Sequence, residues 1–140
     1  MSYLNTKGAL LTQLLGNLPT GVSDTDVSYE NNKFDPTGKD IWLAAYFIPA
    51  TSDAAGKDTN DTDIEEGLYQ ISVFVKLNNG YDLAQLTAID ELKAAFRPSS
   101  QLVYNDQTVN IKNSSLTAGS EAGAFFQRDL TINYLTISER

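Results

Sequence analysis

The chain of 140 residues contains neither histidine nor cysteine. The absence of histidine removes the commonest general base and the commonest transition-metal ligand. The absence of cysteine excludes disulfides, thiolate metal sites and cysteine nucleophiles. The sequence also has no phosphate-binding glycine loop, no nucleophile elbow and no zinc-ligand spacing. We therefore expect a protein that is not an enzyme, with no catalytic residues, no cofactor and no specific metal site.

Basic residues and long apolar runs are also scarce. The chain has 10 Lys and Arg against 18 Asp and Glu, for a formal net charge of −8. This balance disfavours specific binding to nucleic acid and docking on an anionic membrane. No apolar run approaches the roughly 20 residues of a membrane span, and the first residues lack the pattern of a signal peptide. We expect a soluble, cytoplasmic protein.

Two amphipathic helices are predicted from leucine-rich periodicity. Leucines recur at helical spacing over about Tyr3–Asn17, and Pro19 enforces the end of that segment. A second helical pattern follows Asp82, which stands where an N-cap is expected. It runs to about Phe96, and Pro98 ends it. Both apolar stripes are interpreted as core.

Two segments rich in aromatic and β-branched residues, Ile41–Ile48 and Gly67–Leu77, predict neighbouring strands. Val27–Glu30 predicts a shorter one. Pro49 cannot donate to a strand ladder and should end the first long strand. The intervening Thr51–Glu66 is acidic and has no apolar periodicity, which indicates a long, solvated, mobile loop. We expect the two long strands to pair as an antiparallel hairpin across this loop.

The C-terminal third predicts further strands. Gln101–Tyr104 and Thr108–Lys112 flank a turn and should form a hairpin. Asn113–Gly123 is interpreted as a polar loop, and the alternation in Ala124–Ser138 predicts a long strand. Together the elements predict a single α+β domain over residues 1–140. Its sheet should be mixed or mostly antiparallel, with two α-helices on one face.

The acidic loop raises an alternative, a ligand- or calcium-binding module that uses residues 51–66. Asp58, Asp61, Asp63 and Glu65 are closely spaced oxygen ligands. An EF-hand counted from Asp58 requires glycine at its sixth position, where Asp63 stands, so that pattern fails. The loop is predicted to be a solvated surface segment.

The middle of the chain contains a set of residues whose order along the sequence is informative. The set is Glu30-Asn31, Phe34, Pro36, Gly38, Trp42-Leu43, Phe47, Pro49-Ala50 and Gly67-Leu68-Tyr69-Gln70-Ile71-Ser72-Val73.

In this order the set resembles the tail-terminator proteins of long-tailed bacteriophages. The resemblance covers about Leu4–Phe96. It departs from the family where Ala44-Ala45 and the acidic run replace basic residues.

The resemblance implies a structural virion protein of the tail or neck that acts without a cofactor and is found in the host cytoplasm during assembly. Its implied partners are further copies in a hexameric ring, the tail tube protein and the head-connector protein. DNA would pass through the ring without specific binding. Another neck or tail-completion component is the alternative in the same setting. The candidate subunit or tail-tube interface comprises Glu30, Asn31, Phe34, Trp42, Tyr46, Asp58, Asp61, Asp63, Glu65, Glu66 and Tyr69.

Overall fold

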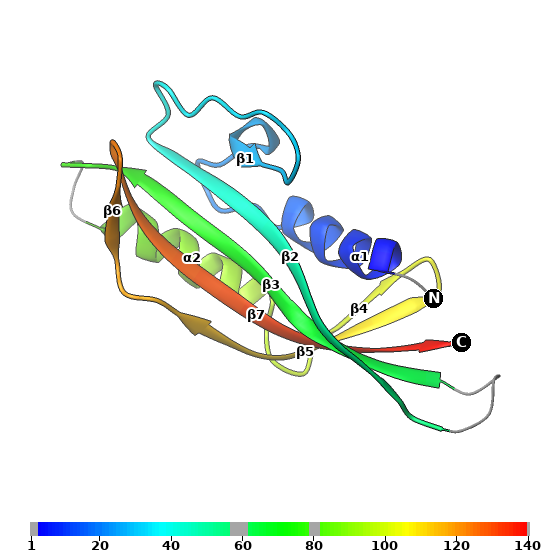
Figure 1. The fold of residues 1–140 in the computed structure, drawn as a ribbon. Helices are drawn as coiled ribbons and strands as arrows, with labels where there is room; N and C mark the ends of the chain where they lie inside the picture. Colours follow the sequence, from blue (N-terminus) through cyan, green and yellow to red (C-terminus); the bar gives the residue numbers. More distant parts are fainter. Residues whose placement is uncertain (1–2, 57–61, 79–81, 140) are drawn as a thin grey trace.

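The computed structural model describes residues 3–56, 62–78 and 82–139. Two helices, α1 (Tyr3–Gly16) and α2 (Leu83–Ala95), lie on one side of a seven-stranded sheet, and β3 and β7 cross in front of α2 in Figure 1. The α+β prediction is confirmed. The short elements are a 3-10 turn (Asp24–Asp26), β1 (Val27–Ser28), β4 (Gln101–Tyr104) and β6 (Ser120–Ala122). The long strands are β2 (Ile41–Ala54), β3 (Thr62–Lys76), β5 (Gln107–Leu116) and β7 (Phe125–Glu139).

The strand order across the sheet is β1-β2-β3-β7-β5-β4, and β6 also pairs with β7. Only β1 and β2 are parallel, and every other pair is antiparallel. The predicted pairing of Ile41–Ile48 with Gly67–Leu77 is confirmed, with Leu43 opposite Val73 and Ala45 opposite Ile71. The C-terminal strand β7 lies next to β3 and forms the centre of the sheet.

The core lies between the helices and one face of the sheet. Leu10 and Leu14 of α1 and Ile89 and Leu92 of α2 pack against strand residues such as Ile71, and all of these are at most 2% exposed. Each such side chain contributes about 1.5–3 kcal/mol by leaving water. The core interpretation is therefore correct for these residues. Leu4, Leu15 and Leu83 of the same predicted stripes are instead 79%, 37% and 68% exposed.

The predicted loop Thr51–Glu66 is wrong over most of its length. β2 continues to Ala54 and β3 begins at Thr62, with Thr51 opposite Glu66 and Asp53 opposite Ile64. These residues lack apolar periodicity because no helix covers them, yet a β-ladder needs only backbone pairing. Residues 57–61, with Asp58 and Asp61, lie outside the described residues, as does the predicted mobility of the loop tip.

The polar segment Asn113–Gly123 is also more ordered than predicted. β5 continues through it to Leu116, and β6 occupies Ser120–Ala122. A bulge between Ile111 and Asn113 shifts the register of β5 against β7. β2 has its own bulge between Pro49 and Thr51. Pro49 therefore marks a bulge rather than the end of a strand, a position that proline tolerates on an edge.

The beginning of α2 is fixed by a contact that the sequence did not predict. Asp82 occupies the N-cap position but makes no capping hydrogen bond. Its Oδ2 instead accepts from Arg128 Nη2 at 2.9 Å, and Arg128 Nε also donates to Gln85 Oε1. Buried Gln85 in turn donates to the Val73 carbonyl. Arg128 thus ties the N-terminal end of α2 to the sheet.

Candidate assembly interface

The sheet has one face without helices, and the predicted interface residues Trp42 and Tyr46 lie on it. Side chains alternate along a strand, so Leu43 and Ala45 enter the core while Trp42, Ala44 and Tyr46 point to the helix-free face. On β3 the helix-free face carries the residues opposite these, Phe74, Ser72 and Gln70.

An aromatic cluster occupies one end of the helix-free face. The rings of Trp42 and Phe74 stack with centroids 3.9 Å apart, and Phe34 and Phe125 approach Trp42 at 4.9 and 5.6 Å. The Trp42 Nε1 donor is buried and has no hydrogen-bond partner within the described part of the chain. Two of the predicted interface residues, Phe34 and Trp42, therefore pack on each other and anchor the loop that precedes β2.

Glu30 closes part of the outer edge of β2. Its Oε1 accepts a hydrogen bond from the Phe47 backbone N–H at 2.6 Å and lies 3.4 Å from Lys7 Nζ. The carboxylate thus accepts a hydrogen bond from a backbone donor that would otherwise be unpaired at the edge of the sheet. The neighbouring Asn31 is exposed and left-handed, with φ 58°, so it serves the turn after Glu30.

Tyr69 is placed in the core, not on the helix-free face. It is 1% exposed, packs against Phe96 and lies on the helix-covered side of β3. Burial raises the pKa of Tyr69, and the Glu30 carboxylate adds to this rise. A contact of this side chain with a partner would require the core to open. The period-2 alternation in β3 places Tyr69 with Ile71 and Val73, a signal that was present in the sequence.

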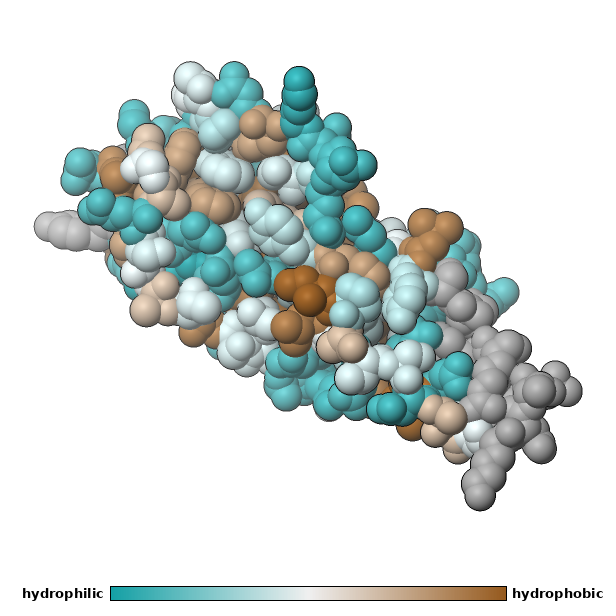
Figure 2. All heavy atoms as spheres, viewed as in Figure 1, coloured by the Kyte–Doolittle hydropathy of each residue, from teal (hydrophilic) through white to brown (hydrophobic). Residues whose placement is uncertain are grey.

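The middle of the helix-free face carries an apolar patch, which we define as exposed Tyr46 and Ile48 with half-buried Leu68. Tyr46 and Ile48 are each 40% exposed, and Ile48 lies opposite Leu68 in the ladder. Figure 2 shows apolar side chains at the centre of this face, surrounded by polar ones. Exposed aromatic and aliphatic groups of this kind are common at protein interfaces.

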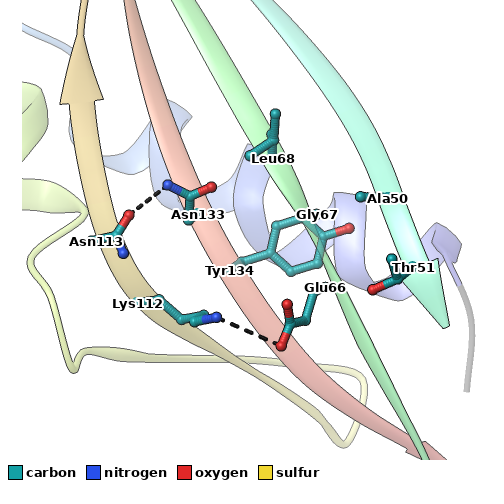
Figure 3. Close-up of a pocket in the computed structure, with 9 residues that line it drawn as sticks. All are labelled: Ala50, Thr51, Glu66, Gly67, Leu68, Lys112, Asn113, Asn133 and Tyr134. Atoms are coloured by element: carbon teal, nitrogen blue, oxygen red, sulfur yellow. Dashed lines mark hydrogen bonds and ion pairs between the residues drawn. The ribbon is translucent and has the colours of Figure 1, made fainter. Parts of the chain in front are cut away.

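A hollow of about 320 Å³ borders the apolar patch. Across it Lys112 Nζ lies 3.6 Å from Glu66 Oε1, and Asn133 Nδ2 donates to Asn113 Oδ1. Figure 3 shows both contacts and the Tyr134 ring reaching over Gly67 toward Ala50. The hollow is lined by Ala50, Thr51, Glu66, Gly67, Leu68, Lys112, Asn113, Asn133 and Tyr134.

Gly67 and Tyr134 make a close approach that the sequence analysis did not predict. A Cβ on Gly67 would lie 2.5 Å from the Tyr134 hydroxyl and 2.7 Å from the Ile48 carbonyl. The glycine therefore leaves room for the tyrosine, whose ring also stacks on Phe47 at 5.9 Å. Burial raises the pKa of Tyr134, and the nearby Glu65 carboxylate contributes. Only the isolated glycine at the beginning of an apolar strand hinted at this close approach.

Beyond Gly67 the sheet continues as a three-stranded extension, which we call the arm. It consists of residues 50–54, 62–66 and 135–139, in which β3 pairs with both β2 and β7. Figure 1 shows these strand ends projecting past the helices. The arm contains the predicted interface residues Asp63, Glu65 and Glu66. Among the described residues, no three carboxylates gather closely enough to hold a metal ion.

Comparison with known proteins identifies the family. A family model described as phage tail terminator protein matches residues 7–134. The chain belongs to the phage tail terminator family. The resemblance seen in the sequence is confirmed, and the protein is a structural component of a phage tail. Within the described residues, this tail terminator has no helix long and apolar enough to cross a membrane.

The fold is also found among solved structures. One solved protein without a functional name is similar over 97% of this tail terminator and 96% of its own chain, with a TM-score of 0.70 and 22% identity. At this identity the similarity establishes the fold alone. No curated protein matches the chain.

Proposed function

We propose that this tail terminator closes the end of the phage tail tube as a ring of identical subunits. The ring ends tube polymerisation and offers the surface to which the head connector joins. The observation that carries the proposal is the family match over residues 7–134. Six subunits are expected from the family resemblance.

The helix-free face is the surface that we assign to assembly contacts. It presents the apolar patch of Tyr46, Ile48 and Leu68 and the adjacent hollow, while the opposite face is covered by helices. A ring requires contacts between different surfaces of neighbouring subunits, which close under rotation. The arm, which projects past the helices, extends this surface. The low content of basic residues is consistent with a ring through which DNA passes without sticking.

The test is electron microscopy of lysates from a phage that lacks this gene product. The proposal predicts tubes of aberrant, extended length that fail to join heads. Tails of normal length joined to heads would overturn it. A second experiment uses Tyr46→Asp, which places a charge on the apolar patch. This variant should reproduce the defect while the monomer stays folded. Tyr46→Phe keeps the apolar surface and should assemble normally.

A further inference from the structure

The two outer edges of the sheet are protected to very different degrees. Along the β2 edge, β1 pairs with β2 at Leu43 and Ala44, and the Glu30 carboxylate accepts a hydrogen bond from the Phe47 N–H. Backbone donors alternate sides along a strand, so Pro49 stands where the next outward N–H would be and has none. These three devices block pairing along β2 as far as its bulge.

Beyond that bulge the edge of β2 is bare. The Ala55 N–H bonds inward to the Thr62 carbonyl, so the donors of Ser52 and Ala54 point outward. No described strand pairs with them. Ser52 and Ala54 are also exposed. The tip of the first edge is therefore a short, unprotected template for another strand.

The second edge has a bare segment of the same length. β4 pairs with β5 only as far as Asn110, and the next outward donor, the Ile111 N–H, bonds to the Ser100 carbonyl. Past the bulge the Thr117 N–H bonds inward to the Asp129 carbonyl, so the donors of Ser114 and Leu116 point outward. Within residues 3–56, 62–78 and 82–139 nothing pairs with these donors. The segment contains no proline and no inward-pointing charge to protect it.

We propose that these two bare segments pair with each other between neighbouring copies of the chain. Residues 52–54 of β2 would add to residues 114–116 of β5 in the next subunit, so that one sheet continues into the next. This inference rests on the proposed ring, which needs two different surfaces on each subunit. The chain supplies two such segments, on opposite edges, each with a matched pair of outward donors.

The offset of the two segments suits a closed sheet. The β2 segment lies level with Thr136 and Ser138 of β7, and the β5 segment lies level with Leu130 and Ile132. At about 3.3 Å per residue, the segments are displaced by roughly 20 Å along the strands. A sheet that closes into a barrel requires a stagger of this kind between its edges. A flat, unstaggered sheet would stack copies without closing.

Proline substitutions test the pairing at the level of single backbone donors. Ser114→Pro and Ser52→Pro remove outward N–H groups that make no bond in the monomer, so the variants should fold but associate at least tenfold more weakly. Ser115→Pro removes an inward donor of the β7 ladder and should lower the midpoint of thermal unfolding instead. Ser114→Ala keeps the N–H and should associate normally. Sedimentation velocity over a concentration series gives the association, and circular dichroism the unfolding.

Cysteine cross-linking identifies the occupant, because the natural chain has no cysteine. Double variants that place cysteine at 52 or 54 and at 114 or 116 should form a ladder of disulfide-linked oligomers, in purified protein and in isolated tails. A disulfide needs Cα atoms within about 7 Å. The control pair Ser52→Cys with Leu83→Cys should give no ladder.

Several outcomes would overturn the pairing. They are the absence of a ladder from all four pairs in both samples, or unchanged association of Ser114→Pro and Ser52→Pro. If either proline variant lost tail capping but kept its self-association, the bare segment would bind the tube protein instead, and the proposed pairing between copies would be overturned as well. In each case extended tubes in the null phage would still support the proposed function, so the two failures are distinguishable.

Discussion

The arm and the helix-covered part of the sheet are built from the same strands but are stabilised differently. In the helix-covered part, residues such as Ile71 and Leu130 are 0% exposed between the sheet and the helices. In the arm, Ile137 is 53% exposed, and residues 50–54 of β2 are all exposed. Thr136 at the base of the arm is 0% exposed and hydrogen-bonded to Gln107, and the rest of the arm is held mainly by backbone pairing of β3 with both neighbours. The comparison shows that strand formation and core formation are separate, and that apolar periodicity reports only the second.

Matched isoleucines on β7 give the largest expected contrast. Ile132 is 0% exposed in the core and Ile137 is 53% exposed in the arm. Ile132→Ala leaves a cavity and should lower the free energy of unfolding by about 2–5 kcal/mol. Ile137→Ala should change it by about 0.5 kcal/mol or less. Urea denaturation of both variants measures the contrast, and equal losses would show that the arm has a core of its own.

This contrast also explains which parts of the fold were predictable. The helices, the central hairpin and the long C-terminal strand were correct because each buries an apolar stripe that is visible in the sequence. The arm was interpreted as the loop Thr51–Glu66 because its strands bury no such stripe. The extension of β5 to Leu116 was missed for the same reason. Backbone hydrogen bonds have no sequence signature, so the sequence analysis missed the strands that depend mainly on them.

The candidate interface was predictable to a smaller extent. The ordered residue set found the family and contains Trp42, and the candidate interface added Tyr46; both lie on the helix-free face. It could not show that Phe34 and Trp42 pack together, or that Tyr69 points inward. The role of Glu30 depends on the Phe47 N–H, which is 17 residues away in sequence. Contacts of this kind depend on strand register, which the sequence does not specify at single-residue precision.

Gly67 lies at the boundary between the two regions and should give the next largest effect. Gly67→Ala places a Cβ 2.5 Å from the Tyr134 hydroxyl and 2.7 Å from the Ile48 carbonyl, so the strands must shift. We expect a loss of about 1–3 kcal/mol in the free energy of unfolding. Gly16→Ala, with nothing within 4 Å, should instead stabilise α1 by about 0.4–1 kcal/mol. Chemical denaturation distinguishes the two, and a neutral Gly67→Ala would refute the close approach.

Glu30 tests the protected part of the β2 edge. Glu30→Ala removes the acceptor for the Phe47 N–H, and we expect a loss of about 1 kcal/mol. The Phe47 amide, left without an acceptor, should also exchange its hydrogen with solvent faster than in the parent protein. Glu30→Gln keeps an acceptor and should retain most of the protection. Amide exchange followed by NMR gives the result, and unchanged protection in Glu30→Ala would show that another group covers this edge.

Two ion pairs extend the comparison to pH, with the smallest expected effect. Lys39 Nζ lies 2.7 Å from Asp26 Oδ1, with side chains 26% and 18% exposed, whereas the arm pair Lys112–Glu66 is 3.6 Å apart and 45% and 43% exposed. The hydrogen bond from Lys39, followed by that from the Ser23 backbone, lowers the pKa of Asp26 below its ordinary value. A lowered folded-state pKa stabilises the protein above the unfolded value of about 3.9, and this contribution is lost as pH falls through the folded pKa.

Asp26→Asn should therefore cost up to about 1 kcal/mol at pH 7 and less at pH 2.5, because the contribution of the carboxylate is lost as pH falls through its lowered pKa. Glu66→Gln in the arm should cost close to zero at both pH values, because exposed pairs contribute little and are screened by salt. Thermal unfolding of the parent and both variants across this pH range provides the measurement. A cost of Asp26→Asn that is as large at pH 2.5 as at pH 7 would mean that Asp26 acts through its packing and not through its charge.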